Sequence, residues 1–411
     1  MNSIVISFGG LRVHYLGCYG GTWIETPAFD RFAAEGFVFD ECFVETPGPA
    51  ATRQSWWTGS YQNFRKPTEP QRRVSGHPSL IRTVRSAGIR TVLIRDSRAL
   101  LENSPDVSAE FDQIIEIERA DADSTDRVFE AARKWLNRES GKCRFLLVID
   151  CHGAHPPWYP REPSHESEAA LDEIEAEREV EGEDEVADAG VARESDSTAD
   201  RARQNYAAVV SHLDSELGSF LDFVRARADW EQSLVLVTSD CGADLEEQHA
   251  ANLGRNVLHE GRVHVPLLVR VPAGHDPASR SRALVQSIDL MPTVCDAYGF
   301  AIPRDVPGRS LLPIVRLQAR SVRDDVLMAD AAHGWSIRTP AWHLILPSPV
   351  IGSETPTEPQ LFVKPDDRWD RNDVAKQYPQ VVEQLQRALQ SHIDEYNTQI
   401  TNDKSQTSSS H

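Results

Sequence analysis

The sequence lacks a long apolar run, a CxxC cysteine pair and a basic stripe. No run approaches the roughly 18 consecutive apolar residues of a membrane span, which excludes a membrane protein. The six cysteines are scattered, which favours free thiols in a reducing compartment. Without clustered Lys and Arg to neutralise phosphates, nucleic-acid binding is not expected. The start, "MNSIVISFGG", lacks the basic residues and cleavage site of a secretion signal and predicts a cytoplasmic protein.

Negative charge is abundant but mostly local. The 411-residue chain has a net charge of −20, and residues 162–200 hold sixteen acidic residues against two arginines. This stretch has no aromatic residue and cannot bury enough apolar surface to offset the entropy of ordering it. It therefore predicts a flexible, partly helical, solvated insertion. An acidic arm that docks a basic partner is the alternative.

Apolar strand-like runs alternate with amphipathic helix-like segments along most of the chain. Strands are predicted at 3–8, 37–44, 89–96, 143–150 and 233–240, and helices at 26–36, 79–88, 125–139 and 206–227. Buried strands separated by helices indicate an α/β fold, a mostly parallel sheet between helix layers. Ligands of such sheets bind beyond the carboxyl ends of the strands.

The residue pattern changes after about residue 325, where short strand-like segments and a terminal helix are predicted. We predict an α/β domain over 1–320 and a small α+β subdomain over 321–397, with an antiparallel sheet and the terminal helix. The polar end, 398–411, is predicted to be a disordered tail.

Several motifs occur in a familiar order. They are "GGLRVHYLGCYGGTWIETPAFDRFAAEGFVFDECFVETPG", "AHPPW", "VTSDCG", "LHEGRVHVPLLVRVP", "SIDLMPTVCDAYGF", "VPGRSLLP" and "WSIRTPAWHLI". Together they resemble the sulfatases of the alkaline phosphatase superfamily over nearly the whole chain. The resemblance implies the fold described above and the chemistry of a sulfuric-ester hydrolase.

Sulfatases of this type carry a Cys or Ser in the pattern (C/S)-x-P-x-R, which is converted to formylglycine, the nucleophile. The resemblance places Arg53 on the arginine of this pattern and Pro49 on the nucleophile. Proline has no nucleophilic atom, and no Cys or Ser lies within three residues upstream of Arg53. The sequence therefore retains the loop of this pattern but lacks the nucleophile that performs its chemistry.

The family also holds a divalent cation, usually calcium, between carboxylates of the first strand and an Asp with an Asn or His at a later strand end. Here the first-strand positions fall on Gly9 and Gly10, and the later pair falls on Asp240 and Cys241. A thiol suits calcium poorly. No cofactor is therefore expected.

In the family, basic residues bind the sulfate and protonate the leaving group. The resemblance places two of these positions at His155 and Arg255. His155 is either a relic of this acid or a packed histidine. A zinc site from Cys151, Cys241 and nearby histidines matches no short-range spacing.

These losses predict a catalytically inactive sulfatase homologue with a residual pocket for a small anion, a sulfate or phosphate ester, or with a scaffold role. The alternatives are a hydrolase with a rebuilt site that uses His155, Arg53 and Asp240, and a partner subunit of an active relative. Arg53 either binds an anion or neutralises a buried carboxylate such as Asp240. We predict that Arg53 or Arg255 pairs with Asp240 across the vacated metal position.

Overall fold

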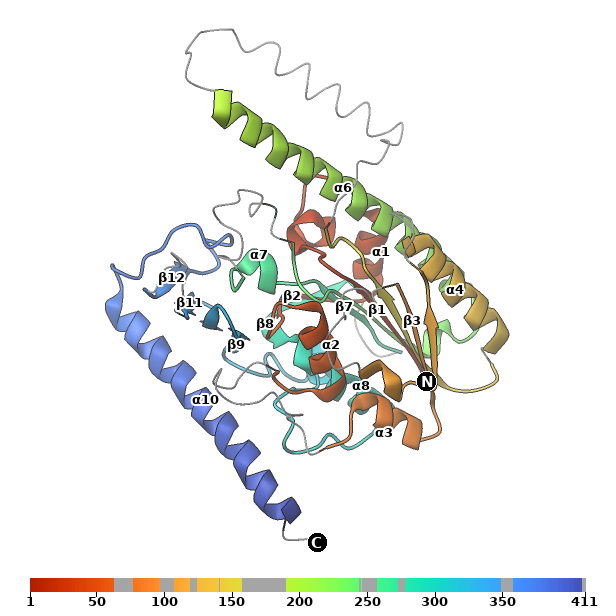
Figure 1. The fold of residues 1–411 in the computed structure, drawn as a ribbon. Helices are drawn as coiled ribbons and strands as arrows, with labels where there is room; N and C mark the ends of the chain where they lie inside the picture. Colours follow the sequence, from red (N-terminus) through yellow and green to blue (C-terminus); the bar gives the residue numbers. More distant parts are fainter. Residues whose placement is uncertain are drawn as a thin grey trace.

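The computed structural model describes residues 1–62, 77–96, 107–118, 124–139, 141–156, 190–243, 245, 257–272, 278–348 and 358–408 (Figure 1). An eight-stranded sheet forms its centre, in the order β4-β3-β5-β1-β6-β7-β2-β8. Its strands are β1 Asn2–Phe8, β2 Phe37–Phe43, β3 Arg90–Arg95, β4 Gln113–Glu116, β5 Phe145–Cys151, β6 Ser233–Thr238, β7 Leu267–Arg270 and β8 Ser279–Gln286. Only β7 runs antiparallel to its neighbours in this sheet. The predicted α/β fold with a mostly parallel sheet is confirmed.

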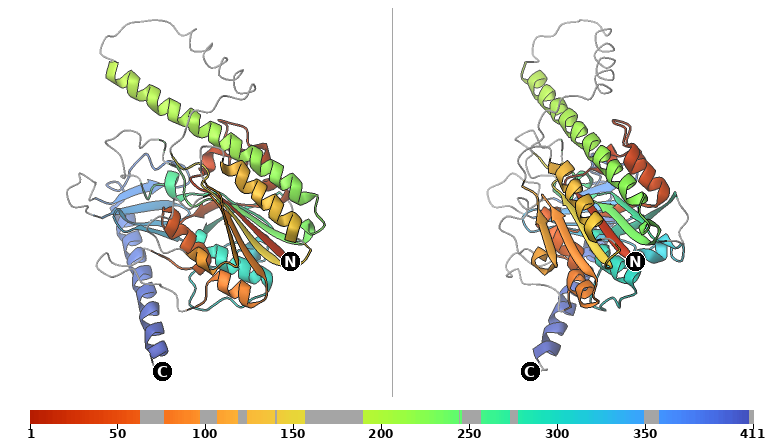
Figure 2. Two further views of the ribbon diagram at one scale, coloured as in Figure 1. Left: turned by 45° about the vertical axis from the view of Figure 1, so that its right-hand side comes forward. Right: turned by 90° about the vertical axis from the view of Figure 1, so that its right-hand side faces the viewer.

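Helices cover both faces of this sheet (Figure 2). One layer holds α1 Pro27–Glu35, α4 Ser124–Glu139 and α6 Gly190–Arg225, and the other holds α2 Pro49–Thr58, α3 Leu80–Ser86 and α8 Leu290–Tyr298. Alternate side chains of β1 enter the two cores, with Ile4, Ile6 and Phe8 on the side of α6 and Val5 on the side of α2. Short helices are α7 Glu260–Val263 and α9 Leu312–Val315, with 3₁₀ turns at Val13–Tyr15, Gly17–Tyr19, Val107–Glu110, Trp230–Gln232 and Ser287–Asp289.

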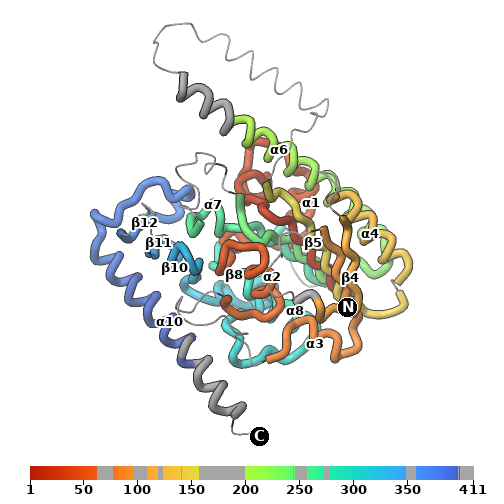
Figure 3. The backbone as a smooth tube through the Cα atoms, viewed as in Figure 1, coloured from red at the N-terminus to blue at the C-terminus, as the bar shows by residue number. Residues whose placement is uncertain are grey.

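A second sheet of four antiparallel strands follows, in the order β12-β11-β10-β9. Its strands are β9 Val326–Asp330, β10 Gly334–Arg338, β11 Trp342–Pro347 and β12 Gln360–Val363. The terminal helix α10, Pro379–Ser408, lies along this sheet (Figure 3). Its Leu385 and Leu389 pack with Leu327 and Leu344 of the sheet in one apolar cluster. The predicted small antiparallel sheet with its terminal helix is therefore present.

Two predicted boundaries need correction or fall partly outside the described residues. Helix α10 continues to Ser408, which corrects the disordered tail predicted from residue 398. Residues 190–200 of the predicted acidic insertion form the first turns of α6, and 162–189 lie outside the described residues. Among the described helices, none combines the length and the apolar character that crossing a membrane requires.

Candidate active site at the carboxyl edge of the main sheet

The predicted site residues converge at one edge of the main sheet. Gly9 and Gly10 follow β1, Asp240 follows β6, and Arg53 lies on α2, which begins just after β2. The carboxyl ends of parallel strands meet at the same edge, so chain segments far apart in sequence come together there.

Arg53 is the centre of this site. Its side chain is buried, and Nε and Nη2 donate to the two carboxylate oxygens of Asp150, each over 2.8 Å. Nη1 donates to Asp240 Oδ2 over 2.6 Å and to the carbonyl oxygen of Pro49 over 2.9 Å. The predicted ion pair between Arg53 and Asp240 is confirmed. Four hydrogen bonds to the protein leave this guanidinium little capacity to bind an added anion.

Asp150 is a functional residue that the sequence analysis missed. It is the penultimate residue of β5, pairs in register with Ser7 of β1, and accepts a hydrogen bond from the Ser7 hydroxyl over 2.5 Å. The available signal was a carboxylate at the end of an otherwise apolar strand, because a buried charge needs a partner. Arg53 thus neutralises two buried carboxylates where the prediction had one.

Asp240 is fully buried and held from three sides. Oδ1 accepts the backbone N–H of Gly10 over 2.9 Å, while Oδ2 contacts Arg53 and lies 2.9 Å from His155 Nε2. Burial alone would raise the pKa of Asp240, but His155 and Arg53 outweigh it and hold that pKa far below its usual range. Burial opposes the charge of Arg53 in turn, yet Asp150 and Asp240 raise its pKa above the usual value. Asp240 and Arg53 are therefore both charged in the folded protein.

The residues at this edge do not fit calcium. A Cβ added to Gly9 would lie 2.4 Å from Cδ2 of His155 and 2.6 Å from the carbonyl oxygen of His152, so the His155 ring occupies the room that a side chain at position 9 needs. Gly10 has a φ of 68°, which an L side chain rarely adopts. No carboxylate can be supplied from either position without rearrangement.

The remaining donor set also differs from a calcium site. Among the described residues, His155, Asp240 and Cys241 could share a metal ion. Burial, reinforced by Asp240, raises the pKa of the Cys241 thiol above its usual range, which keeps it protonated. One carboxylate, an imidazole and a neutral thiol do not match the six to eight or so oxygens that calcium takes. The guanidinium of Arg53 supplies the positive charge instead.

The start of α2 carries no nucleophile. Pro49 is the first helical residue, where its fixed φ and missing N–H are favourable. The hydroxyls of Thr52 and Ser55 donate to the backbone carbonyls of Thr46 and Ala51. The proposed loss of function at Pro49 is therefore not offset by a neighbouring hydroxyl of this helix.

Other predicted residues have simpler outcomes. Trp56 and Trp57, which follow Arg53 on α2, are buried in the core. Arg255 lies outside the described residues, so its place at the site stays a prediction.

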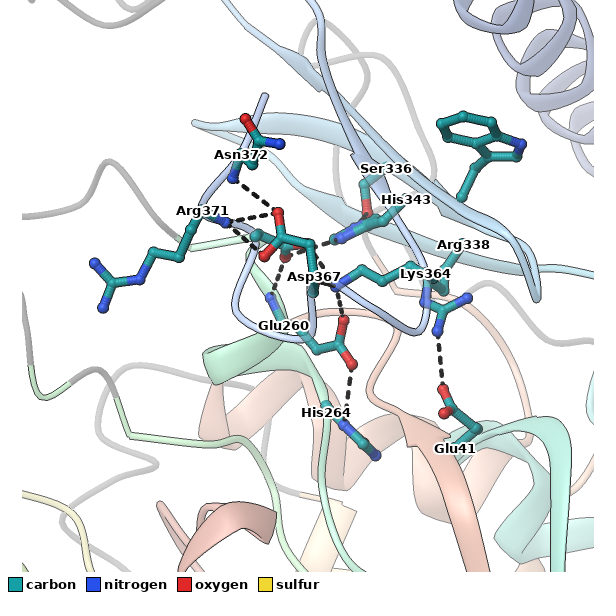
Figure 4. Close-up of polar contacts among 12 residues, drawn as sticks. Glu41, Glu260, His264, Ser336, Arg338, His343, Lys364, Asp367, Arg371 and Asn372 are labelled. Carbon is teal, nitrogen blue, oxygen red and sulfur yellow. Dashed lines mark hydrogen bonds and ion pairs between the residues drawn. The ribbon is translucent and has the colours of Figure 1, made fainter. Parts of the chain in front are cut away.

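A second buried polar cluster, which the sequence analysis did not foresee, joins α7 to the small sheet (Figure 4). The Nζ atom of Lys364 contacts Glu260 and lies 2.7 Å from Asp370 Oδ1. His343 Nδ1 lies 3.0 Å from Asp370 Oδ2, and His264 Nδ1 lies 3.4 Å from Glu260 Oε1. Glu260, His343 and Asp370 are close enough to share a metal ion. Lys364 already supplies the positive charge between the two carboxylates.

Part of this cluster has the order of a catalytic triad. Ser336 Oγ lies 3.2 Å from His343 Nε2, and Nδ1 of the same ring faces Asp370. Ser336 and His343 are both 0% exposed, so no substrate can reach the hydroxyl. The array is a structural connection between the two sheets.

The cluster predicts a stability maximum in mildly acidic solution. Burial would raise the pKa of Glu260, but His264 and Lys364 lower it to about 2. Its stabilisation is present above the unfolded pKa of about 4.3 and is lost as the pH falls toward the folded value. Burial lowers the pKa of His264, but Glu260, together with Glu41 and the backbone of Asp40, raises it above its usual value. The stabilisation from His264 is therefore present below about 6.5 and is lost as the pH rises through the folded pKa.

We therefore expect Glu260→Gln to remove on the order of 3 kcal/mol near pH 5 and to flatten both limbs of the pH profile. Urea unfolding from about pH 3 to about pH 8 measures this effect. Glu383→Gln, an exposed change on α10, is the matched control. Identical pH profiles for Glu260→Gln and the unsubstituted chain would contradict the assignment.

Comparisons with known proteins follow this geometry. The sequence profile described as "Sulfatase" matches residues 2–300. Arylsulfatase K of Danio rerio is 29% identical over 201 residues, which cover 47% of this chain and 37% of that protein. The chain thus matches well under two thirds of the length of that relative. An N-acetylglucosamine-6-O-sulfatase of Bacteroides thetaiotaomicron is 20% identical over 395 residues, covering 75% of this chain and 70% of the relative.

Solved structures share the architecture. A putative sulfatase of Bacteroides fragilis superposes with a TM-score of 0.78 at 17% identity, covering 96% of each chain. A protein in complex with its substrate D-glucosamine-2-N,6-O-disulfate gives 0.74 at 18% identity, covering 97% of this chain and 98% of the other. A phosphonate monoester hydrolase of Agrobacterium radiobacter gives 0.69 at 18% identity, covering 96% of each chain. At these identities the likeness shows a shared fold.

Proposed function

The chain belongs to the sulfatase family, and on this premise we propose that it is a member without hydrolytic activity that binds a small anionic ester. The observation that carries the proposal is the guanidinium of Arg53, bound between Asp150 and Asp240. In this arrangement the former catalytic centre is an internal ion-pair core.

Two further features support the absence of hydrolysis. Pro49 offers no atom that could attack sulfur or phosphorus, and the nearby hydroxyls of α2 bond to backbone carbonyls. The His155–Asp240 pair could orient a proton acceptor, but the neighbouring Cys241 thiol is buried and its raised pKa keeps it protonated, which makes it a poor nucleophile. A rebuilt hydrolase therefore has less support than a binding protein.

The class of ligand is inferred from the relatives. One is named for a sulfated N-acetylglucosamine, and one solved neighbour holds a disulfated glucosamine. We extend this class, a carbohydrate carrying a sulfate or phosphate group, to the present chain. Inactivity, a cytoplasmic location and a role as partner of an active relative stay predictions.

Calcium is expected to leave the thermal stability unchanged. A bound ion stabilises the folded state by mass action, on the order of 3 kcal/mol at a hundredfold excess over Kd. We expect melting temperatures in millimolar calcium and in chelator to agree within about one degree. The control is Asp240→Asn, which removes the retained carboxylate of the family's metal position.

A rise of several degrees in the unsubstituted chain that disappears in Asp240→Asn would show a working calcium site and overturn the proposal. A rise that persists in Asp240→Asn would place calcium elsewhere and leave the proposal intact.

A further inference from the structure

Arg12 is a buried cation without a counter-ion among the described residues. It follows β1 in the quoted "GGLR" motif and is 8% exposed. Its backbone N–H donates to the hydroxyl of Tyr206. Its guanidinium makes no hydrogen bond or ion pair with any residue that the structure describes, and the Nε atom is buried without a partner. Because burying an unpaired charge is costly, a fold retains one where a ligand of opposite charge binds.

The surroundings of Arg12 are positive. Its Cζ lies 4.8 Å from the ring centroid of Trp369, and Cζ of Arg368 lies 5.0 Å from the same centroid. The His14 ring centroid is 4.2 Å from that of Trp369. The pKa of His14 is lowered to about 3, chiefly by burial. The charges of His264, Arg12 and Arg368 lower it further, and Glu260 opposes the shift.

A second arginine without an ion pair to any described residue follows Gly261, which Arg12 contacts. A Cβ added to Gly261 would be 3.2 Å from Arg12 Nη2, so this guanidinium rests against the first turn of α7. The next residue, Arg262, has a buried Nε without a hydrogen bond to any described residue. Neither arginine forms an ion pair within the described parts of the chain. Arg262 thus directly follows the residue that the Arg12 guanidinium contacts, in a protein whose net charge is −20.

This pair is separate from the Arg53 core but close to it. The N–H of Gly242 donates to the carbonyl oxygen of Arg262 over 2.8 Å, and Gly242 follows Asp240 by two residues. Arg53 uses its donors on Asp150 and Asp240, whereas the guanidinium groups of Arg12 and Arg262 form no hydrogen bond with any described residue. A guanidinium pair of this kind suits a tetrahedral oxyanion, which accepts hydrogen bonds from both.

We propose that Arg12, which lies against Trp369, binds the sulfate or phosphate group of an anionic carbohydrate together with Arg262. The assignment of carbohydrate rests on the proposed function, whereas the assignment of an oxyanion rests on the two arginines alone. In this proposal the ion pairs of Arg53 with Asp150 and Asp240 stabilise the fold, and the ligand binds next to them.

Isothermal titration with four probes tests the proposal: inorganic sulfate, inorganic phosphate, glucosamine 6-sulfate and glucosamine 6-phosphate. We expect at least one sugar ester to bind more tightly than its inorganic ion. Arg12→Met and Arg262→Met should each weaken that binding roughly ten- to a hundredfold, as expected for the loss of charge-assisted hydrogen bonds. Arg31→Met on α1, a side chain 57% exposed, is the matched control and should bind as the unsubstituted chain does.

Thermal unfolding without any anion separates a ligand-binding role from a structural one. Arg12→Met should be as stable as the unsubstituted chain or more so, because it removes an unpaired buried charge. A marked loss of stability in Arg12→Met, binding unchanged in both variants, or no binding of any probe would overturn the proposal. Binding of the inorganic ions alone would uphold the oxyanion site and overturn the carbohydrate. Ester turnover is measured separately, so a failure of the inactive assignment is distinguishable from each of these results.

Discussion

Aryl sulfate and aryl phosphate are expected to hydrolyse in the presence of the purified chain at the rate of the buffer blank. Removing a nucleophile that works as a unit with its partners costs roughly a millionfold in rate. Here the nucleophile position is Pro49, and the cation position is held by a guanidinium bonded to Asp150 and Asp240. Stopped and continuous assays with 4-nitrophenyl sulfate and 4-nitrophenyl phosphate measure the rate.

Restoring the nucleophile alone should not restore the reaction. Pro49→Cys combined with Ala51→Pro, which recreates the C-x-P-x-R pattern, is co-expressed with a formylglycine-generating enzyme and is expected to stay at the blank rate because Gly9 and Gly10 still lack carboxylates. Turnover by the unsubstituted chain that is clearly above the blank and is lost in Arg53→Met would contradict the account and support the rebuilt hydrolase.

Arg53→Met is expected to be the most destabilising single change at the site. It leaves Asp150 and Asp240 buried without their cation, at a cost of about 3–5 kcal/mol. Asp240→Asn should cost less, because Arg53 keeps its bidentate pair with Asp150. Urea unfolding at neutral pH measures both, with Arg31→Met on the surface as the control.

The pH dependence of this effect has a defined sign. In the native chain the pKa of Asp240 is depressed, so its stabilisation is present above the unfolded value of about 3.9 and is lost below it. In Arg53→Met burial dominates more strongly and favours the protonated carboxyl. The difference between the two proteins should therefore shrink as the pH falls below about 4. A difference independent of pH would indicate that Arg53 acts through packing and not through its charge.

Much of the fold could be predicted because its central strands are continuous apolar runs. β1, β5 and β6 are buried on both faces, and such runs are distinctive. β4 alternates between half-buried and exposed residues at the sheet edge, and β7 has four residues, so neither produces a strong local pattern. The end of α10 was missed because its polar composition is also typical of a tail.

The site could be predicted only where a motif marked it. Arg53 and Asp240 were paired in advance because both fall on motif positions that meet at one pocket. The cluster around Lys364 was invisible, because it joins residues about a hundred positions apart that no local pattern connects. Arg12 belongs to a quoted motif, but only the structure shows that its guanidinium has no hydrogen-bond acceptor among the described residues.

Diffraction from crystals grown in millimolar calcium together with an aryl sulfate tests the central claim most directly. The account predicts the guanidinium of Arg53 between Asp150 and Asp240, with no calcium bound to Asp240. A calcium ion bound to Asp240, with Arg53 displaced from it, would contradict the account.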